Sequence, residues 1–413
     1  MNISRPHGHR LSPVSFVLAS LFFAALSANA GAQSFPPAWS ASANGYAGGD
    51  LVAYNQNYYR ALQAQAKGAI KSLVTSGYWE LSELRFTATP MKVGNQTGDT
   101  FKTFQQAWQF IANARIDPGA SITIVVDQAP PVFTQPLNLD HPFGSQIFIQ
   151  GTSQTNVNFL FDACDGIVLD NAHVLGGLSN LTLEGTNRTG NILLTSGTRG
   201  MLVSSNAVLN TQNVTINSFD TGAQCQGGGT LILGVANHPD WIDNFQSNGV
   251  YATDHSLIDI RAPLSYGGLG LLSGQEGIHC SDSAEIKAPG CSVTNCAYDD
   301  FLAETGGYII ATSAYADGGG GISVGFHSKN GGIINANDST ANGAKTAYLS
   351  EFGSKLYAEF ATIATPSTGD DFVAYMGSFI ATLSTTGSPA TKSQTDGTTG
   401  SSFLGTFGSL ISQ

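Results

Sequence analysis

Charged residues are scarce in this chain. Only 11% of its 413 residues are Asp, Glu, Lys or Arg, and 29 acidic residues against 17 basic ones give a formal net charge of −12. So few cations cannot neutralise an extended run of phosphates, which argues against nucleic acid as a partner. The balance also argues mildly against a polyanionic substrate, although a local basic groove would outweigh a global count.

Long apolar runs and metal-binding cysteine patterns are also lacking. The one apolar run, from Val14 to Leu26, is shorter than the roughly 20 residues of a membrane span, so we expect no membrane partner. The five cysteines have no zinc-site spacing, and we predict no metal site or cofactor. Cys291 and Cys296 are close enough in sequence for a disulfide that closes a small loop, but buried free thiols fit equally well.

The first 32 residues have the pattern of a secretory signal peptide. Arg5 and Arg10 precede the apolar run, and small-x-small sites follow at Ala28-Asn29-Ala30 and Ala30-Gly31-Ala32. We therefore predict a secreted protein, extracellular or periplasmic. Removal of residues 1–32 takes both arginines and changes the net charge from −12 to −14.

Glycine, by contrast, is abundant, with 49 residues, and Ser, Thr and Asn accompany it. This composition indicates many tight turns between short strands, as in an all-β repeat protein.

Residues 36–84 form a separate aromatic-rich segment that we predict to be a small β-rich module. It contains Trp39, the Tyr46-Ala47-Gly48-Gly49-Asp50-Leu51-Val52 turn, the Tyr58-Tyr59-Arg60-Ala61 strand and Trp79.

This segment resembles the chitin-binding-type carbohydrate modules of families 5 and 12, except that the Pro often found before the last Trp is missing. The resemblance implies a sugar platform, because aromatic faces stack on the C–H faces of pyranose rings. We expect Trp39, Val52 and Trp79 to be partly structural. The predicted sugar contacts of the module are Trp39, Tyr54, Tyr58, Tyr59 and Trp79.

Residues 90–383 contain a repeat of strand-like segments. Eight strand starts recur at Gly200, Ala223, Gly249, Gly277, Asp300, Gly325, Ala347 and Asp371, with steps of 23, 26, 28, 23, 25, 22 and 24 residues. Most of these strand starts are followed, after a turn, by a second strand, such as Ser283-Ala284-Glu285-Ile286. This repeat predicts a right-handed parallel β-helix, a single-chain solenoid with two matched strands per coil.

The two ends of the predicted β-helix differ. Helical apolar spacing from Phe101 to Ala112, with Asp99 or Thr100 as N-cap, predicts a helix that covers the first coil. The Asp140 to Gly151 segment resembles the opening coils of pectin-lyase-fold and phage tail-spike proteins. Residues 384–413 are rich in Ser, Thr and Gly and form either a flexible tail or a thin cap.

Alternation along each strand assigns the faces of the coils. Phe301 with Ala303 and Ile278 with Cys280 are predicted to point inward. The same alternation predicts two rows of outward side chains. The first row is Tyr251, His279, Leu302, His327 and Leu349, and the second is Thr253, Ser281, Glu304, Lys329 and Glu351.

Glycoside hydrolysis needs two carboxyl groups about 5 to 9.5 Å apart, a distance that one or two stacked coils span. The long steps insert residues 233–248 and 262–276 beside the coils that carry the outward histidine and acids. Tyr298-Asp299-Asp300 resembles the paired aspartates of polygalacturonase-type hydrolases. Trp241-Ile242-Asp243 resembles a pectate lyase motif. In both cases the residues that flank the motif in those families are missing. The candidate acids are Asp240, Asp243, Asp254, Asp282, Asp299, Asp300 and Glu304.

A lyase would instead need a base and a cation, which His279 with Lys329 or Arg261 could supply, and such an enzyme could use Ca²⁺. Trp241, Tyr251 and Lys329 are further predicted substrate contacts. Outward charges could equally form a solvated ladder. Two functions therefore stay open: a secreted polysaccharide-degrading enzyme, hydrolase or lyase, and a non-catalytic glycan-binding adhesin or tail-spike relative.

Overall fold

The structure of this chain is a computed structural model. It describes residues 39–412 except 41–44, 49, 55–56, 67–76, 83–84, 87–88, 97, 113, 129, 131, 187, 190–191, 194–196, 236–237, 262–264, 269–275, 319–322, 366–370, 383–385, 388–402 and 405–409. The predicted signal peptide lies outside the described residues. Among the helices in the described part, none is long and apolar enough to cross a membrane.

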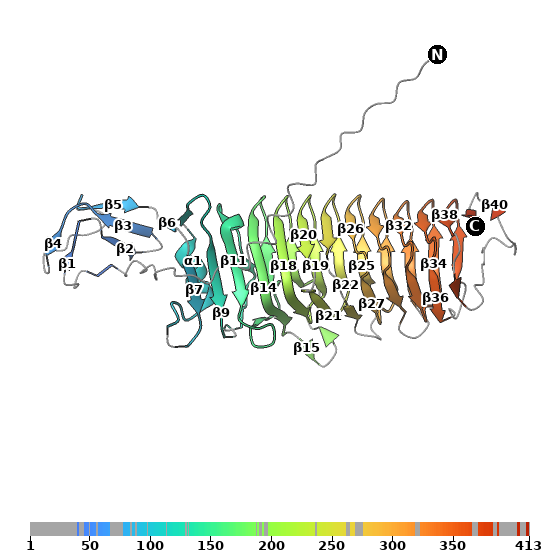
Figure 1. The fold of residues 1–413 in the computed structure, drawn as a ribbon, viewed down its shortest axis with the longest axis horizontal. Helices are drawn as coiled ribbons and strands as arrows, with labels where there is room; N and C mark the ends of the chain where they lie inside the picture. Colours follow the sequence, from blue (N-terminus) through green and yellow to red (C-terminus); the bar gives the residue numbers. More distant parts are fainter. Residues whose placement is uncertain are drawn as a thin grey trace, which may run out of the picture.

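The main body is an elongated right-handed parallel β-helix, as the repeat predicted (Figure 1). Its first sheet has ten parallel strands, each hydrogen-bonded to the equivalent strand of the next coil. In order they are β10 (Leu137–Asn138), β13 (Ile167–Leu169), β17 (Arg199–Val203), β19 (Thr221–Cys225), β22 (Asn248–Ala252), β25 (Glu276–Cys280), β28 (Asp299–Ala303), β31 (Val324–Ser328), β34 (Thr346–Glu351) and β37 (Phe372–Tyr375).

A second sheet follows the first after a short turn in each coil. Near the start of the solenoid, the long strands β14 (Val174–Gly185) and β18 (Val208–Asn217) run through both the second and third sheets. The second sheet then continues as β20 (Thr230–Leu233), β23 (Leu257–Ile260), β26 (Glu285–Lys287), β29 (Tyr308–Ile310), β32 (Ile333–Asn335), β35 (Lys355–Tyr357) and β38 (Phe379–Ala381).

The third sheet corrects the prediction of two strands per coil. Residues 233–248 are not a loop insertion, because they contain β21 (Trp241–Phe245), which pairs in parallel with β18. Strands of only three to five residues are too short to show a clear alternation in the sequence, which is why this row was missed. The third sheet also contains β12 (Asn158–Phe161), β24 (Ser265–Gly268), β27 (Ser292–Thr294), β30 (Tyr315–Asp317), β33 (Thr340–Asn342), β36 (Thr362–Thr365) and β39 (Thr386–Gly387).

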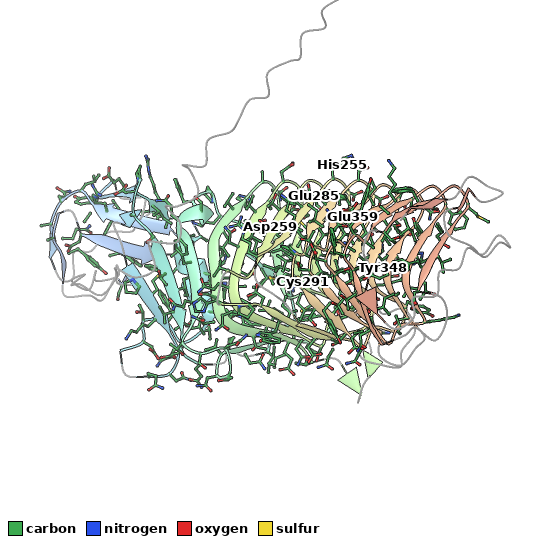
Figure 2. All side chains as sticks on the ribbon, turned by 45° about the vertical axis from the view of Figure 1, so that its right-hand side comes forward. His255, Asp259, Glu285, Cys291, Tyr348 and Glu359 are labelled. Atoms are coloured by element: carbon green, nitrogen blue, oxygen red, sulfur yellow. The ribbon has the colours of Figure 1, made fainter. Side chains whose placement is uncertain are left out.

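The interior of the solenoid is one apolar core. Phe301, Phe326, Tyr348 and Phe372 are fully buried and stack with ring centroids 4.8 to 5.1 Å apart on successive coils. The predicted inward residues Ile278, Cys280 and Ala303 are likewise buried. Figure 2 shows the contrast between Cys291 and Tyr348 in the interior and His255 on a turn at the outer edge.

The cysteines form no disulfide. Cys291 and Cys296 are not bonded to each other, and both thiols are buried, as are those of Cys225 and Cys280. They therefore serve as small apolar residues of the core.

Helix α1 (Phe104–Ile111) packs its Phe104, Ala107 and Ile111 side chains into the first coils, which include β7 (Thr89–Val93), β9 (Ile122–Val126) and β11 (Ile147–Gly151). Its N-cap is Thr103 instead of the predicted Asp99 or Thr100, because Thr103 and Gln106 form a reciprocal capping box. A short 3-10 helix η3 (Gly144–Gln146) precedes β11.

The N-terminal segment is a small antiparallel unit at one end of the solenoid (Figure 1). Its sheet consists of β2 (Leu51–Tyr54), β3 (Asn57–Ala61) and β5 (Trp79–Ser82), beside the pair β1 (Gly45–Tyr46) and β4 (Gln65–Ala66). Arg85–Phe86 (β6) pairs with Arg115–Ile116 (β8), and β15 (Arg188–Thr189) with β16 (Ile192–Leu193) in a hairpin.

The C-terminal segment ends the solenoid. Strand β41 (Leu410–Ser412) pairs in parallel with β38 and antiparallel with β40 (Phe403–Leu404). At least this part of residues 384–413 is therefore a cap on the last coil.

Candidate functional site

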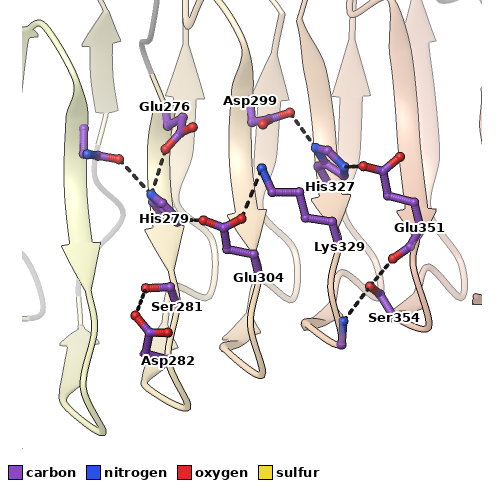
Figure 3. Close-up of polar contacts among 12 residues, drawn as sticks. Glu276, His279, Ser281, Asp282, Asp299, Glu304, His327, Lys329, Glu351 and Ser354 are labelled. Atoms are coloured by element: carbon purple, nitrogen blue, oxygen red, sulfur yellow. Dashed lines mark hydrogen bonds and ion pairs between the residues drawn. The ribbon is translucent and has the colours of Figure 1, made fainter.

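A cluster of ionisable side chains lies on the outward face of the first sheet, on coils β25 to β34 (Figure 3). We call it the charged cluster. Its members are Glu276, His279, Asp299, Glu304, His327, Lys329 and Glu351. The cluster arises because outward positions of a parallel β-helix stack at roughly 4.8 Å per coil, which brings residues far apart in sequence into contact.

His279 is the centre of the first half of the cluster. Its Nδ1 lies 2.7 Å from Glu276 Oε2 and 3.1 Å from Asn248 Oδ1, and its Nε2 lies 3.0 Å from Glu304 Oε1. Glu304 also pairs with Lys329, whose Nζ lies 3.2 Å away. The Tyr251 ring packs against the imidazole with centroids 4.6 Å apart.

His327 repeats this arrangement two coils further on. Its Nδ1 lies 3.0 Å from Asp299 Oδ1 on the preceding coil, and its Nε2 lies 3.2 Å from Glu351 Oε1 on the following coil. Asn248 and Glu304 occupy the same register positions relative to His279. The motif is thus a histidine held between a residue of the coil before and an acid of the coil after.

Both imidazoles are held in the protonated form. Burial disfavours the charge, but the hydrogen bonds and charges of Glu276 and Glu304 outweigh it and raise the pKa of His279 to about 9. Asp299 and Glu351 likewise raise the pKa of His327 to about 9 against its burial. The hydrogen bond from His279, helped by Lys329, lowers the pKa of Glu304 to about 2.

The cluster is sheltered from solvent. His279 and His327 expose only 9% and 8% of their surface, and every residue of β28, including its outward ones, is buried. The outward positions of the second and third sheets are less buried, as in β26 and β27. Ion pairs in so sheltered a place interact more strongly than at an open surface, and their charges cost more to desolvate.

Five of the predicted site residues of the solenoid lie together in the structure, four as members of the charged cluster and one in contact with it. His279, Asp299, Glu304 and Lys329 belong to the charged cluster, and Tyr251 packs on His279. Glu276, His327 and Glu351 were not among the predicted site residues, although His327 and Glu351 stood in the predicted outward rows. Glu276 precedes the predicted strand start by one residue, so the row analysis did not reach it.

Asp240 and Asp300 are buried and do not reach the outward face. Asp240 accepts hydrogen bonds from Thr211 Oγ1, Val214 N and Gly234 N, and so fixes the chain between two strands. Burial raises its pKa to about 6. Asp300 points inward, and burial, with the nearby Asp299 charge adding to it, raises its pKa well above the usual range.

Trp241 and Asp243 lie on another sheet. They are outward residues of β21 in the third sheet, so they do not line the first sheet beside His279. Asp254 and Asp282 lie in turns, where their φ angles are positive. Arg261, which directly follows β23, forms an ion pair with Asp259. None of these residues contacts the charged cluster through an ion pair.

Aromatic residues of the N-terminal unit form its small core. Val52 and Trp79 are buried, as expected, and Tyr46 packs edge-on to Trp79 with centroids 5.1 Å apart. Trp39 and Tyr59 are partly buried against the same core. The side chains of Tyr54 and Tyr58 lie outside the described residues.

Among the described residues, no group of three or more His, Cys, Asp or Glu side chains has an arrangement that could hold a metal ion. Comparison with protein-family models, with curated proteins and with solved structures found no match.

Proposed function

We propose that the protein is a secreted enzyme that hydrolyses a neutral polysaccharide at the charged cluster of the first sheet. The observation that supports this most is the gathering of seven ionisable side chains on one sheltered face of a chain with only 11% charged residues. Clusters of desolvated groups with shifted pKa values are typical of reactive sites.

A purely structural role does not require these charges. The outward row that carries His279 and His327 carries Leu302 and Leu349 on the coils between and after them. Leu302 is completely buried, so leucine packs well in this row. Because buried ion pairs seldom stabilise a protein more than apolar residues of similar size, chemistry is the better reason for the histidines.

Two carboxylates flank His279 on opposite sides of its ring. Glu276 binds Nδ1 and Glu304 binds Nε2, so one imidazole and two hydrogen bonds separate them, on the scale of the roughly 5 to 9.5 Å that glycoside hydrolysis uses. With a pKa of about 2, Glu304 is ionised and suits a base or nucleophile. Glu276, the carboxyl group on the opposite side of the ring, is then the proton donor to the leaving oxygen, and protonated His279 holds the two carboxyl groups in place between them.

The charge balance of the cluster favours a neutral substrate. Its four carboxylates outnumber its three cations, and each cation has a carboxylate within 3.2 Å. No excess positive charge is present in the cluster to bind the carboxylate of a uronate. Hydrolysis is therefore favoured over the elimination that a lyase performs.

The N-terminal unit supports attachment to an insoluble glycan. Its aromatic-rich antiparallel sheet has the size and composition of the carbohydrate modules that residues 36–84 resemble. Anchoring raises the local concentration of the polysaccharide at the solenoid.

The test is incubation of the mature protein with neutral and uronate polysaccharides, following new reducing ends and absorbance of unsaturated uronates. New reducing ends on neutral glycans without absorbance support hydrolysis.

Glu304→Gln and Glu276→Gln should each lower the rate by about 10²- to 10⁴-fold, the usual contribution of general acid–base groups. Glu285→Gln, on the second sheet of the same coil, should keep the rate. Absorbance together with new ends would show a lyase instead.

A second candidate is a non-catalytic glycan-binding adhesin. The repetition of the histidine motif at His327 favours it, because a scaffold repeats its contacts from coil to coil. Retention on intact glycan with no new reducing ends would support the adhesin and overturn the hydrolase.

A further inference from the structure

We infer that the outward face of the third sheet, around Trp241, is a second binding surface for a neutral polysaccharide, separate from the charged cluster. Trp241 is the most telling residue of this face. It exposes 42% of its surface on the outward side of β21, whereas Trp79 of the N-terminal unit exposes 6%. An exposed Trp on a rigid strand is a preformed flat surface for stacking.

Small polar residues leave the indole open. Thr215 pairs with Trp241 on the preceding coil. On the following coil Ser265 directly precedes Tyr266, the partner of Ile242, and Gly267 pairs with Asp243. The Thr215 side chain is too short to cover the indole ring, in agreement with the 42% of the Trp241 surface that is exposed.

The rest of the face is hydroxylic, amidic and mildly acidic. Among the residues whose side chains the structure describes, its two outward rows contain no Lys or Arg. One row consists of Thr182, Thr215, Trp241, Ser292, Tyr315, Thr340 and Thr362, and the other of Glu184, Asn217, Asp243, Thr294, Asp317 and Asn342. The second sheet differs, since its outward positions include Lys287 and Lys355. Hydroxyl and amide groups at regular spacing match the hydroxyls of a sugar chain.

The local hydrogen bonds hold these polar groups in place. Gln154 Nε2 donates to Thr215 Oγ1 at 2.6 Å, and Asn244 Nδ2 donates to Asn217 Oδ1 at 2.8 Å. Exposed Asp243 accepts from Asn244 N at 2.8 Å. Fixed polar groups beside an aromatic ring orient a ligand at little entropic cost.

These features favour a neutral glycan over other ligands. The acids Glu184, Asp243 and Asp317, with no cation in their rows, would repel a uronate chain. A protein partner is disfavoured because Trp241 is surrounded by polar residues, while the centre of a protein interface is apolar.

The experiment is acrylamide quenching of tryptophan fluorescence in the full chain, with cellohexaose and chitohexaose as probes. The chain has four tryptophans, and subtraction of the Trp241→Phe emission isolates that of Trp241. We expect a saturating hexasaccharide to lower the quenching constant of Trp241 about twofold, because a bound ligand covers most of its contact surface.

A variant that keeps the fluorophore sharpens the test. Thr215→Lys places a long charged side chain beside Trp241 and should abolish the protection, whereas Tyr298→Ala, which removes an exposed aromatic ring elsewhere, should preserve it. Trp241 quenching that stays unchanged with both sugars overturns the inference, whether or not the protein still binds glycan. The readout does not depend on cleavage, so its failure and the failure of the proposed hydrolysis are distinguishable.

Discussion

At the scale of single residues, the least expected feature is a carboxyl group in the apolar core. Asp300 is completely buried, beside the buried thiol of Cys296. The same register position is Gly277, Gly325 and Ala347 on three other coils, and the buried Asp371 on the last. The β-helix therefore has a place for a small residue here and does not need the carboxylate.

We predict that Asp300→Ala stabilises the protein at neutral pH. The raised pKa means that the folded state binds a proton that the unfolded chain releases near pH 4, so stability is lost as pH rises above that value. The alanine variant should gain about 1 to 3 kcal/mol in free energy of unfolding at pH 8 and less at pH 4.

Urea denaturation at both pH values measures this difference. Asp259→Ala, which breaks only a surface ion pair with Arg261, should change the free energy of unfolding by less than about 0.5 kcal/mol. A destabilised Asp300→Ala protein would mean that the carboxyl group makes a contact worth more than its burial costs.

The histidines of the charged cluster have the opposite pH dependence. A folded-state pKa of about 9, above the unfolded value of 6.5, gives stability that is complete below pH 6.5 and disappears as pH rises through 9. We predict a fall in melting temperature between pH 7 and pH 10, with at most about 3 kcal/mol from each histidine.

His327→Gln should lower stability at pH 7, because Asp299 and Glu351 lose their cation, and should flatten the fall toward pH 10. Thermal scans across this range provide the measurement. Exposed His238→Gln is the control and should follow the wild-type curve. An equal fall in His327→Gln and wild type would show that other groups cause the pH dependence.

At the scale of the structural elements, close packing inside each coil decides which small residue is tolerated. A Cβ atom at Gly277 would lie 2.2 Å from Val293 Cγ1 and 2.6 Å from Asp300 O. At Gly325 the nearest atoms are Ala347 O at 2.8 Å and two alanine Cβ atoms at 3.5 Å. The third-sheet residue opposite the glycine therefore decides how much room there is.

We predict that Gly277→Ala destabilises the protein by about 1 to 3 kcal/mol, because Val293 and the β28 backbone must shift. Gly325→Ala, the matched substitution two coils away, should cost less, since only one backbone oxygen is too close. Chemical denaturation of the two variants ranks them, and a larger loss for Gly325→Ala would contradict the packing argument.

At the scale of the whole molecule, a solenoid must protect both of its open ends. Helix α1 lies over the first coils, and β41 adds a strand beside β38 at the other end. An uncovered parallel strand presents unpaired backbone groups to other molecules. The end caps thus keep the solenoid from extending through its neighbours.

We predict that deletion of residues 406–413 causes self-association, because it removes β41 and leaves β38 as an edge. Light scattering after size-exclusion chromatography, over a range of concentrations, reports the mass. Substituting Ile411→Asp in the full chain keeps the length and should produce the same effect. A deletion variant that stays at one mass at every concentration would show that β41 is not a protective cap.

Much of this architecture followed from local patterns. The parallel β-helix and the inward and outward rows were predicted correctly from the repeat and from alternation, as Ile278, Phe301 and Ala303 illustrate. Two errors were local too. The third strand of each coil was missed because three-residue strands such as β27 carry almost no periodicity, and the helix began later because Gln106 completes a cap with Thr103.

The sequence by itself determined that successive coils stack, since each 22- to 28-residue repeat places the same kinds of residue at the same positions. Only the tertiary structure decided which acids meet which cations. Asp299 and Asp300 are neighbours in the chain, yet Asp299 pairs with His327 on the outward face of the first sheet and Asp300 lies in the core beside Cys296. The physical reason is that alternation is interrupted at the start of the strand, where Asp300 and Phe301 both face the core, while contacts across coils depend on the length of every turn between them.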